Sequence, residues 1–315
     1  MPVETDPVNL ARSDRERGVA PPSARSPGVA RVVRERFQDH SQRKPSQEVC
    51  QALSNVRIVE SGGLPIAVLD RAASAALMVD VALSRRGQGQ RALVFTSANG
   101  QVLSLCARDA GLRSLMLEAD LIHADGMPMV LASRLLHTTP LPERVATTDL
   151  FHDVAVLAQR RGARFFLLGA AKTVVDRAVQ RVRELYPDLE IVGHSCGYMR
   201  RAGDEERIIE EINRAQPDIV WLGLGVPREQ DFAVRNRERL HHVGLIKTSG
   251  GLFDFLSGKN SRAPAWMQRC GLEWAYRIYL EPRRLIGRYL VTNPHAVFLL
   301  LTRSGQVAWH RADPR

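Results

Sequence analysis

Three polar stretches of the sequence hold the residue types that proton transfer and phosphate binding require. They are Thr96-Ser97-Ala98-Asn99, Asp125-Gly126 and Gly223-Leu224-Gly225-Val226-Pro227-Arg228-Glu229-Gln230. Each stretch follows an apolar run that is typical of a buried strand. We therefore expect these polar groups to lie where strands end.

Asp125 is the first candidate for a catalytic group. An apolar approach, Leu121-Ile122-His123-Ala124, precedes it, and a Gly-Met-Pro break follows it. This setting would hold one carboxylate at the point where a strand ends, and there it could act as a general base. Asp-Gly is also common in turns. The residues alone leave both interpretations open.

The stretch from Thr96 to Asn99 supplies two hydroxyls and an amide directly after a strand-like run. These groups suit substrate hydrogen bonding. Ser and Asn after a strand are equally typical of a helix N-cap. Capping therefore remains an alternative for this stretch.

The stretch from Gly223 to Gln230 contains two glycines that allow close backbone approach, and Arg228 could meet a phosphate. It lacks the GxGxxG spacing of a dinucleotide site and the GK[ST] of a P-loop. The chain also contains no Asp-x-Asp, which argues against a sugar-nucleotide site built around a divalent metal. We expect a phosphate-bearing ligand and no metal.

Strand-like runs alternate with helical patterns from Val56 onward. The runs predicted as strands cover residues 56–59, 65–69, 92–97, 164–169, 189–192, 218–223 and 243–248. Asp70 is predicted to cap a helix over 71–85. Such alternation predicts a Rossmann-like α/β fold, with a parallel sheet covered by helices on both faces. Ligands bind beyond the C-terminal strand ends of such sheets, where we expect Ser97, Gly169, Gly225 and Gly250.

The two ends of the chain differ from this pattern. Residues 1–55 are rich in Pro, Ser, Arg and Glu and are predicted to be a disordered leader before a core over 56–261. Residues 262–303 interleave Trp and Tyr with Arg and are predicted to be a helical basic and aromatic appendage, followed by a tail over 304–315. The Glu281-Pro282 step should divide the appendage into two helices.

Charge and composition limit the kinds of partner that the chain is expected to bind. The formal net charge is +10, and residues 266–315 hold eight Arg against three acidic residues. A basic end suits nucleic acid, anionic lipid or a phosphorylated substrate, and a solvated helix face is the alternative.

The four cysteines have no metal or disulfide spacing, which favours reduced thiols. The apolar run Ala296–Leu301 is too short to span a bilayer, so membrane contact is expected to be peripheral.

Taken together, the motifs resemble the WecG/TagA/CpsF family of bacterial glycosyltransferases over residues 56–295. The motifs that carry the resemblance occur in this order: Ser97-Ala98-Asn99, Ala124-Asp125-Gly126, Leu141-Pro142-Glu143-Arg144-Val145, Phe166-Leu167-Leu168-Gly169, Gly225-Val226-Pro227, Gly250-Gly251-Leu252-Phe253-Asp254-Phe255-Leu256-Ser257-Gly258, Arg262-Ala263-Pro264-Ala265-Trp266, Leu272-Glu273-Trp274, Tyr276-Arg277 and Glu281-Pro282-Arg283-Arg284.

This resemblance implies an inverting, metal-independent transfer of a hexose or N-acetylhexosamine. The donor would be a UDP-sugar, and the acceptor a polyprenyl-diphosphate-linked sugar in surface polysaccharide assembly. The enzyme would work peripherally at the cytoplasmic face of the bacterial inner membrane, with the appendage on its anionic surface. Asp125 would be the general base, and Ser97 a second catalytic residue in place of the family's Thr.

The resemblance also implies binding residues. Asn99 and Arg144 would hold the sugar and diphosphate, and Gln230 and Asp254 would face the nucleotide. Arg277, Arg284 and Arg288 would close over the site and stabilise the leaving diphosphate. The remaining expected contacts of the donor are Thr96, Gly225, Arg228 and Glu229.

Two departures from the family pattern stand out. The family usually reads Pro-x-Gln-Glu where this chain has Pro227-Arg228-Glu229-Gln230, so the sequence leaves open which of Glu229 and Gln230 faces the nucleotide. Around Thr147, in Ala146-Thr147-Thr148-Asp149-Leu150, the family's usual glycine is replaced. This loop is therefore expected to favour a somewhat different sugar.

Two other functions are alternatives to this one. A nucleotide-sugar epimerase or dehydrogenase could use a similar sheet, although it would be expected to show GxGxxG. A basic nucleic-acid-binding protein could use the interleaved aromatic and Arg side chains. The sequence does not fix the donor sugar, with N-acetylmannosamine and glucose both compatible, nor the acceptor, the pathway or a homo-oligomeric state.

Overall fold

The computed structural model describes residues 46–199 and 201–305, which belong to one compact unit. Most of the predicted leader, Arg200 and the end of the predicted tail lie outside the described residues. Ser46–Ser54 form a helix, although the sequence places them in the leader. Val49 and Leu53 of this helix are buried, so the folded core begins before the predicted boundary at residue 56.

The strands are β1 (Ile58–Ser61), β2 (Leu64–Ala67), β3 (Leu93–Ala98), β4 (Leu121–Ala124), β5 (Phe165–Gly169), β6 (Ile191–Ser195), β7 (Ile219–Gly223) and β8 (Leu245–Thr248). The helices are α2 (Ser46–Ser54), α3 (Arg71–Ser84), α4 (Gly100–Cys106), α5 (Ala110–Leu117), α6 (Met127–Leu136), α7 (Thr147–Arg161), α8 (Lys172–Leu185), α9 (Asp204–Ala215), α10 (Arg228–Asn236), α11 (Leu252–Leu256), α12 (Ala265–Arg269), α13 (Glu273–Leu280) and α14 (Pro282–Thr302).

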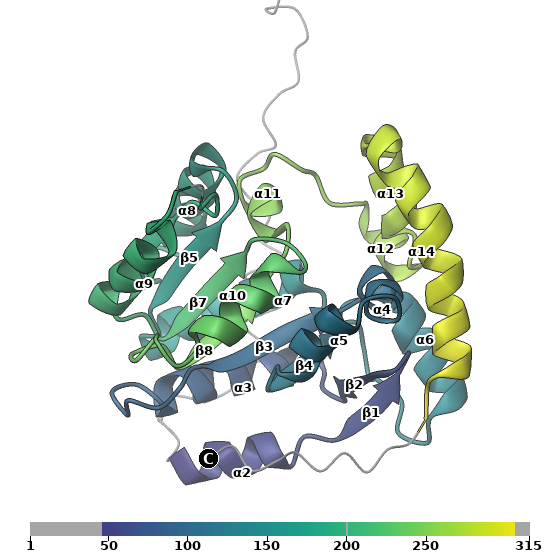
Figure 1. The fold of residues 1–315 in the computed structure, drawn as a ribbon, viewed down its shortest axis with the longest axis horizontal. Coiled ribbons are helices and arrows are strands. Elements are labelled where there is room, and N and C mark those ends of the chain that lie inside the picture. The colour runs from purple at the N-terminus through teal and green to yellow at the C-terminus, as the bar shows by residue number, and fades with distance from the viewer. Residues whose placement is uncertain (1–45, 200, 306–315) are drawn as a thin grey trace, which may run out of the picture. The chain divides into compact units, whose positions relative to one another are not determined.

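A parallel sheet forms the centre of the fold, as the sequence predicts (Figure 1). Its strand order is β4-β3-β8-β7-β5-β6, and each pair of neighbouring strands in it is parallel. β7 and β5 read Ile-Val-Trp-Leu-Gly and Phe-Phe-Leu-Leu-Gly and are buried along their whole length. Continuous apolar strands of this kind require cover on both sides.

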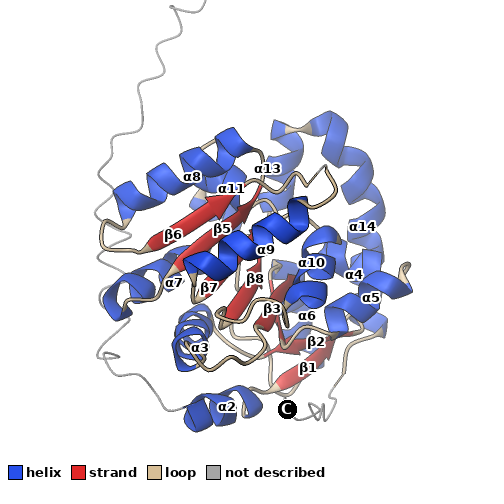
Figure 2. Ribbon diagram, turned by 60° about the vertical axis from the view of Figure 1, so that its left-hand side comes forward, coloured by secondary structure: helices blue, strands red, loops and turns tan. Residues whose placement is uncertain are grey.

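Helices supply that cover on both faces of the sheet (Figure 2). On one face, α9 and α10 pack against the sheet through a cluster that includes Ile209, Phe232 and Ile246. On the opposite face α3 packs against α7, and Phe151 of α7 contacts the rings of Phe165 and Trp221. The two-faced α/β prediction is therefore confirmed.

The first elements match their sequence signals. β1 and β2 form an antiparallel hairpin through Gly62 and Gly63, both with positive φ, which suits the two-residue turn that glycine permits. The Asp70 carboxylate accepts a hydrogen bond from the Ala73 N–H and caps α3 as predicted. Residues 100–117 form two helices, α4 and α5, because Asp109 caps a new helix at Ala110.

Three helices form residues 265–302, whereas the sequence predicts two. The break at Glu281-Pro282 occurs as predicted between α13 and α14, and α12 is an additional short helix. α14 packs along α4 and α6 (Figure 1). Its Leu299 and Leu300 are buried with residues of β1, β2 and α4. The last part of α14 therefore belongs to the core of this unit.

Candidate active site

The C-terminal ends of four adjacent strands bring the predicted chemical stretches together. β4, β3, β8 and β7 are consecutive in the sheet, and their ends carry Asp125, Asn99, Ser249 and Leu224 respectively. The Asp125 N–H donates to the Ala98 carbonyl at 2.7 Å, and the Ser249 N–H donates to the Leu222 carbonyl at 2.7 Å. These backbone bonds fix the loops at one edge of the sheet, as parallel topology predicts.

The Asp125 side chain caps helix α7, which begins 22 residues later in the chain. Its Oδ2 accepts hydrogen bonds from the Thr147 backbone N–H at 3.3 Å and from the Thr147 hydroxyl at 3.2 Å. The N-cap residue of α7, Ala146, has no side chain that can do this. The positive end of α7 therefore lies against the Asp125 carboxylate and favours its charged form.

The Asp125 carboxylate has opposing influences on its charge. Burial raises its pKa, while the Arg144 charge, the Thr147 N–H, the Arg277 charge and the Lys247 charge act to lower it. Both hydrogen bonds that its side chain accepts among the described residues reach Oδ2. Oδ1 is left to accept a proton. A carboxylate with a raised pKa and one unengaged oxygen has the properties of a general base.

A buried lysine lies beside this carboxylate. Lys247 of β8 is fully buried, and its ammonium donates to the Ser97 hydroxyl and to the Thr248 carbonyl, each at 2.9 Å. Burial lowers the pKa of Lys247 to about 8, against the attraction of Asp125 and Glu229. It therefore supplies a positive charge inside the sheet edge near neutral pH.

The stretch Thr96–Asn99, at the end of β3, contributes both to the fold and to the candidate site. Thr96 is buried and shares a hydrogen bond of 2.7 Å with Thr248. Asn99 caps α4, since its Oδ1 accepts from the Val102 N–H at 3.1 Å, which confirms the capping interpretation for this residue. Ser97 is partly exposed and lies between Lys247 and Thr147.

Glu229 joins two glycine loops. Its Oε2 accepts from the Gly225 N–H at 3.2 Å and from the Gly250 N–H at 2.9 Å, and burial raises its pKa. Gln230 is also buried and donates to the Thr96 hydroxyl at 3.3 Å, while its Oε1 has no partner among the described residues. Arg228, at the start of α10, is exposed. Both residues of the altered Pro-x-Gln-Glu motif are therefore buried behind the loops.

An ion-pair network places Arg144 close to Asp125. Arg144 Nη1 donates to Glu273 Oε2 of α13 at 2.7 Å, and its Nη2 lies 3.7 Å from Asp149 Oδ2. Arg262 pairs with Asp149 at 2.9 Å and with Glu273 at 3.4 Å. Burial acts to raise the pKa of Asp149, but Arg262, Arg71 and Arg144 outweigh it and lower that pKa. The C-terminal helices thus hold an arginine of the core.

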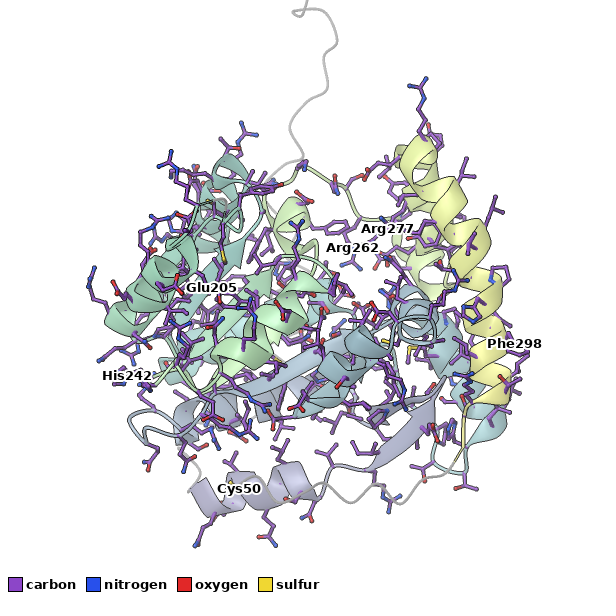
Figure 3. The ribbon with its side chains drawn as sticks, viewed as in Figure 1. Cys50, Glu205, His242, Arg262, Arg277 and Phe298 are labelled. Atoms are coloured by element: carbon purple, nitrogen blue, oxygen red, sulfur yellow. The ribbon has the colours of Figure 1, made fainter. Side chains whose placement is uncertain are left out.

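The remaining predicted residues belong to α11, α13 and α14. Arg277 of α13 stacks over the Phe255 ring at 5.1 Å, and Figure 3 shows it with Arg262 between α11 and the C-terminal helices. Asp254 of α11 accepts from Lys259 Nζ at 2.9 Å. Arg288 is exposed and donates to Gln101 at 3.4 Å. The side chain of Arg284 lies outside the described residues.

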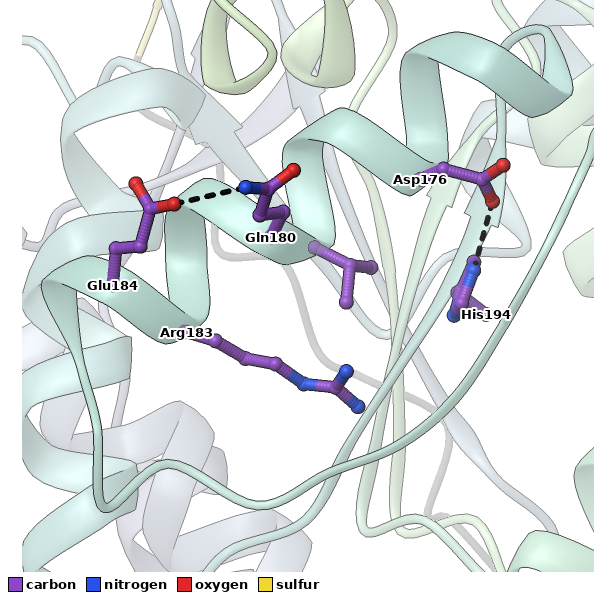
Figure 4. A pocket seen from close by; sticks show the side chains of 6 residues that line it. Asp176, Gln180, Arg183, Glu184 and His194 are labelled. Carbon is purple, nitrogen blue, oxygen red and sulfur yellow. Dashed lines mark hydrogen bonds and ion pairs between the residues drawn. The ribbon is translucent and has the colours of Figure 1, made fainter.

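A surface pocket of about 520 Å³ lies elsewhere, between α8 and β6 (Figure 4). Its polar side chains pair with one another, as Asp176 with His194 at 3.0 Å and Gln180 with Glu184 at 3.1 Å. β6 is at the opposite edge of the sheet from β4. This pocket is therefore separate from Asp125.

Comparison with known proteins decides the family. The family model described as Glycosyl transferase WecG/TagA/CpsF family matches residues 59–308. This chain belongs to that family. The resemblance inferred from the motifs is confirmed, and this WecG/TagA/CpsF protein is a glycosyltransferase. The comparisons give no support to an epimerase, a dehydrogenase or a nucleic-acid-binding protein.

Three relatives share the name N-acetylglucosaminyldiphosphoundecaprenol N-acetyl-beta-D-mannosaminyltransferase. The Bacillus subtilis (strain 168) protein is 34% identical over 61% of this chain and 73% of its own length. The Bacillus spizizenii protein is 33% identical over 68% of this chain and 80% of its own length. The Staphylococcus aureus (strain NCTC 8325) protein is 26% identical over 64% of this chain and 77% of its own length.

Two findings on this glycosyltransferase concern metal binding and membrane-spanning helices. Among the described residues, no group of three or more His, Cys, Asp or Glu side chains is placed to hold a metal ion. Within the same residues, no helix is both long enough and apolar enough to cross a membrane.

Three residues of the candidate site were not predicted from the sequence. Lys247 looked like an ordinary strand residue in Leu245-Ile246-Lys247-Thr248, although a lysine inside an apolar strand is itself an unusual signal. Thr147 was noted only as a departure from the family, and Asp149 only as part of a motif. Their contacts with Asp125 and Arg144 join segments far apart in the chain.

Proposed function

We propose that this glycosyltransferase transfers N-acetylmannosamine, with inversion, from its UDP-linked donor to a polyprenyl-diphosphate-linked N-acetylglucosamine. The names of relatives that are 33–34% identical over most of their length support this transferred sugar and this acceptor. The single observation that carries the proposal is the Asp125 carboxylate, held through Oδ2 at the sheet edge where ligands bind in this class of fold.

The reaction uses Asp125 as a general base. Asp125 Oδ1 takes the proton of the acceptor hydroxyl as that oxygen attacks the anomeric carbon of the donor. The bond between the anomeric carbon and the diphosphate oxygen breaks, and its electron pair leaves with UDP. Attack from the face opposite the leaving group inverts the anomeric configuration. Ser97 lies one hydroxyl away from Asp125 and supports the same group.

Positive groups stabilise the departing diphosphate. Arg144 and Arg277 act electrostatically on Asp125, so both lie near the reacting centre. Arg288, exposed on α14, adds a further positive charge on this side of the protein. Cations placed where negative charge develops lower the barrier to transfer. The glycine loops that Glu229 joins, at Gly225 and Gly250, offer backbone approach to the nucleotide, with Arg228, Gln230 and Asp254 nearby in the chain.

The C-terminal helices bring the site to a membrane surface. Their exposed side chains include Trp266, Trp274, Tyr279 and Phe298, together with the exposed Arg283 and Arg288. Aromatic and basic side chains favour the headgroup region of an anionic bilayer. The enzyme works peripherally on the leaflet that holds its lipid-linked acceptor, at the cytoplasmic face of the bacterial membrane.

UDP release tests this function. The purified chain is given UDP-N-acetylmannosamine, UDP-glucose or UDP-N-acetylglucosamine, with a short-chain polyprenyl-diphosphate N-acetylglucosamine as acceptor. We expect acceptor-dependent UDP release with the first donor and a β-linked product by NMR. Preference for UDP-glucose would replace the donor assignment, and absence of turnover with every donor would refute the proposed reaction.

A further inference from the structure

A chain of hydroxyls connects the buried lysine to the candidate base. Lys247 Nζ lies 2.9 Å from Ser97 Oγ, Ser97 Oγ lies 3.2 Å from Thr147 Oγ1, and Thr147 Oγ1 lies 3.2 Å from Asp125 Oδ2. These groups come from β8, β3, the start of α7 and the end of β4. Four separate segments therefore meet in one line of polar atoms.

The chemistry of the groups fixes the direction of each hydrogen bond. An ammonium has only donors, and an ionised carboxylate has only acceptors. Lys247 must therefore donate to Ser97, and Thr147 must donate to Asp125. Each hydroxyl has a single proton, so Ser97 can only donate to Thr147. One arrangement satisfies all three contacts, and every bond in it points from the cation to the anion.

We propose that Thr147 and Ser97 are positioning residues that carry the polarisation of buried Lys247 to Oδ2 of Asp125, leaving Oδ1 as the proton acceptor. This rests on the proposed role of Asp125 as the base. The relay fixes the carboxylate in one orientation, and it keeps the carboxylate charged although burial favours the neutral form. Thr147 serves twice, because its backbone N–H also donates to Oδ2.

The electrostatic setting is compatible with this role. Asp125 is influenced by Arg144 from the loop before α7, by Arg277 from α13 and by Lys247 from β8. Lys247 is influenced by Asp125 and by Glu229 of α10. Burial and the Lys247 charge both lower the pKa of the buried His123 of β4. Lys247 is therefore the cation that reaches Asp125 through the hydroxyl line, whereas the two arginines act on it by charge alone.

Valine at position 147 tests the relay, because it matches threonine in shape and lacks the hydroxyl. Thr147→Val removes one hydrogen bond to the charged carboxylate, so the pKa of Asp125 should rise by about one unit. The acid limb of the pH profile of kcat/KM then moves to higher pH by about one unit. Thr147→Ser keeps the hydroxyl and restores the wild-type limb. Thr173→Val, at an exposed position on α8, is the matched control and leaves the limb unchanged.

A titration that needs no turnover completes the test. Carbon-13 NMR of carboxyl-labelled Asp in the full chain follows Asp125, which is assigned by the signal missing from Asp125→Asn. A raised Asp125 pKa in Thr147→Val, with the wild-type pKa in Thr147→Ser, supports the relay. The same pKa in all three proteins overturns it. If the wild type releases no UDP, the proposed function fails while this titration still decides the relay.

Discussion

Replacing Lys247 by methionine should change the pH dependence of stability in a measurable way. Lys247 is fully buried, and burial lowers its pKa from 10.5 to about 8. The folded protein therefore binds this proton less tightly than the unfolded chain does. Below pH 8 the lysine is charged in both states, and keeping that charge buried lowers the free energy of unfolding. Methionine has a similar length and carries no charge.

The size of the effect follows from linkage. Between the two pKa values, about 8 folded and 10.5 unfolded, the unfolded chain holds one proton more than the folded protein. The free energy of unfolding therefore rises with pH in this window by about 1.4 kcal/mol per pH unit. From pH 8 to pH 10 the gain is about 2 kcal/mol for the wild type, because the folded protein is only half deprotonated at pH 8, and Lys247→Met loses it.

Urea unfolding of both proteins at pH 8 and pH 10 measures this gain. All other ionisable groups are shared, so the wild-type minus variant difference isolates Lys247 to a first approximation. Lys172→Met, which removes a lysine with 77% of its side chain exposed on α8, is the control and should show no such change. A Lys247→Met difference that stays constant between the two pH values would refute the argument that this ammonium is buried and destabilised.

Three further predictions concern the site and its support. Asp125→Asn should lower kcat by about 10²–10⁴-fold, since a general base contributes that much, while UDP binding measured by calorimetry stays nearly unchanged; full turnover would remove Asp125 from its role. Glu273→Gln removes the charge that holds Arg144 Nη1, so kcat/KM should fall about tenfold, equivalent to ~1.4 kcal/mol, and an unchanged value would show that Arg144 needs no anchor from α13. Leu299→Ala should lower the free energy of unfolding by about 2–5 kcal/mol, because this leucine is buried with core residues; a loss below about 0.5 kcal/mol in urea unfolding would show that α14 is not part of the core.

Local sequence signals predicted the fold well. Continuous apolar runs such as Phe165-Phe166-Leu167-Leu168 indicated buried parallel strands, and Asp70 and Glu281-Pro282 marked helix boundaries that the structure confirms. These features depend on neighbours within a few residues. The boundary between α4 and α5 is not marked in the apolar pattern, because Val102, Leu105 and Leu112 keep one helical periodicity across Asp109.

The candidate site could be predicted only in part. Asp125 stood out from its position after a strand, and the family motifs pointed to Arg144 and Arg277. Whether Glu229 or Gln230 faces the nucleotide could not be read from the motif, because both prove to be buried and Glu229 joins two loops that lie 25 residues apart in the chain, at Gly225 and Gly250.

The sequence by itself determined the family, the alternating α/β pattern and the edge of the sheet where we propose that the chemistry takes place. Tertiary structure alone decided which groups act on Asp125. Lys247, Ser97 and Thr147 come from three segments, and their contacts exist only because parallel strands end at the same edge and α7 begins beside them. Hydrogen bonds and buried charges depend on distances of a few ångströms, which sequence spacing does not contain.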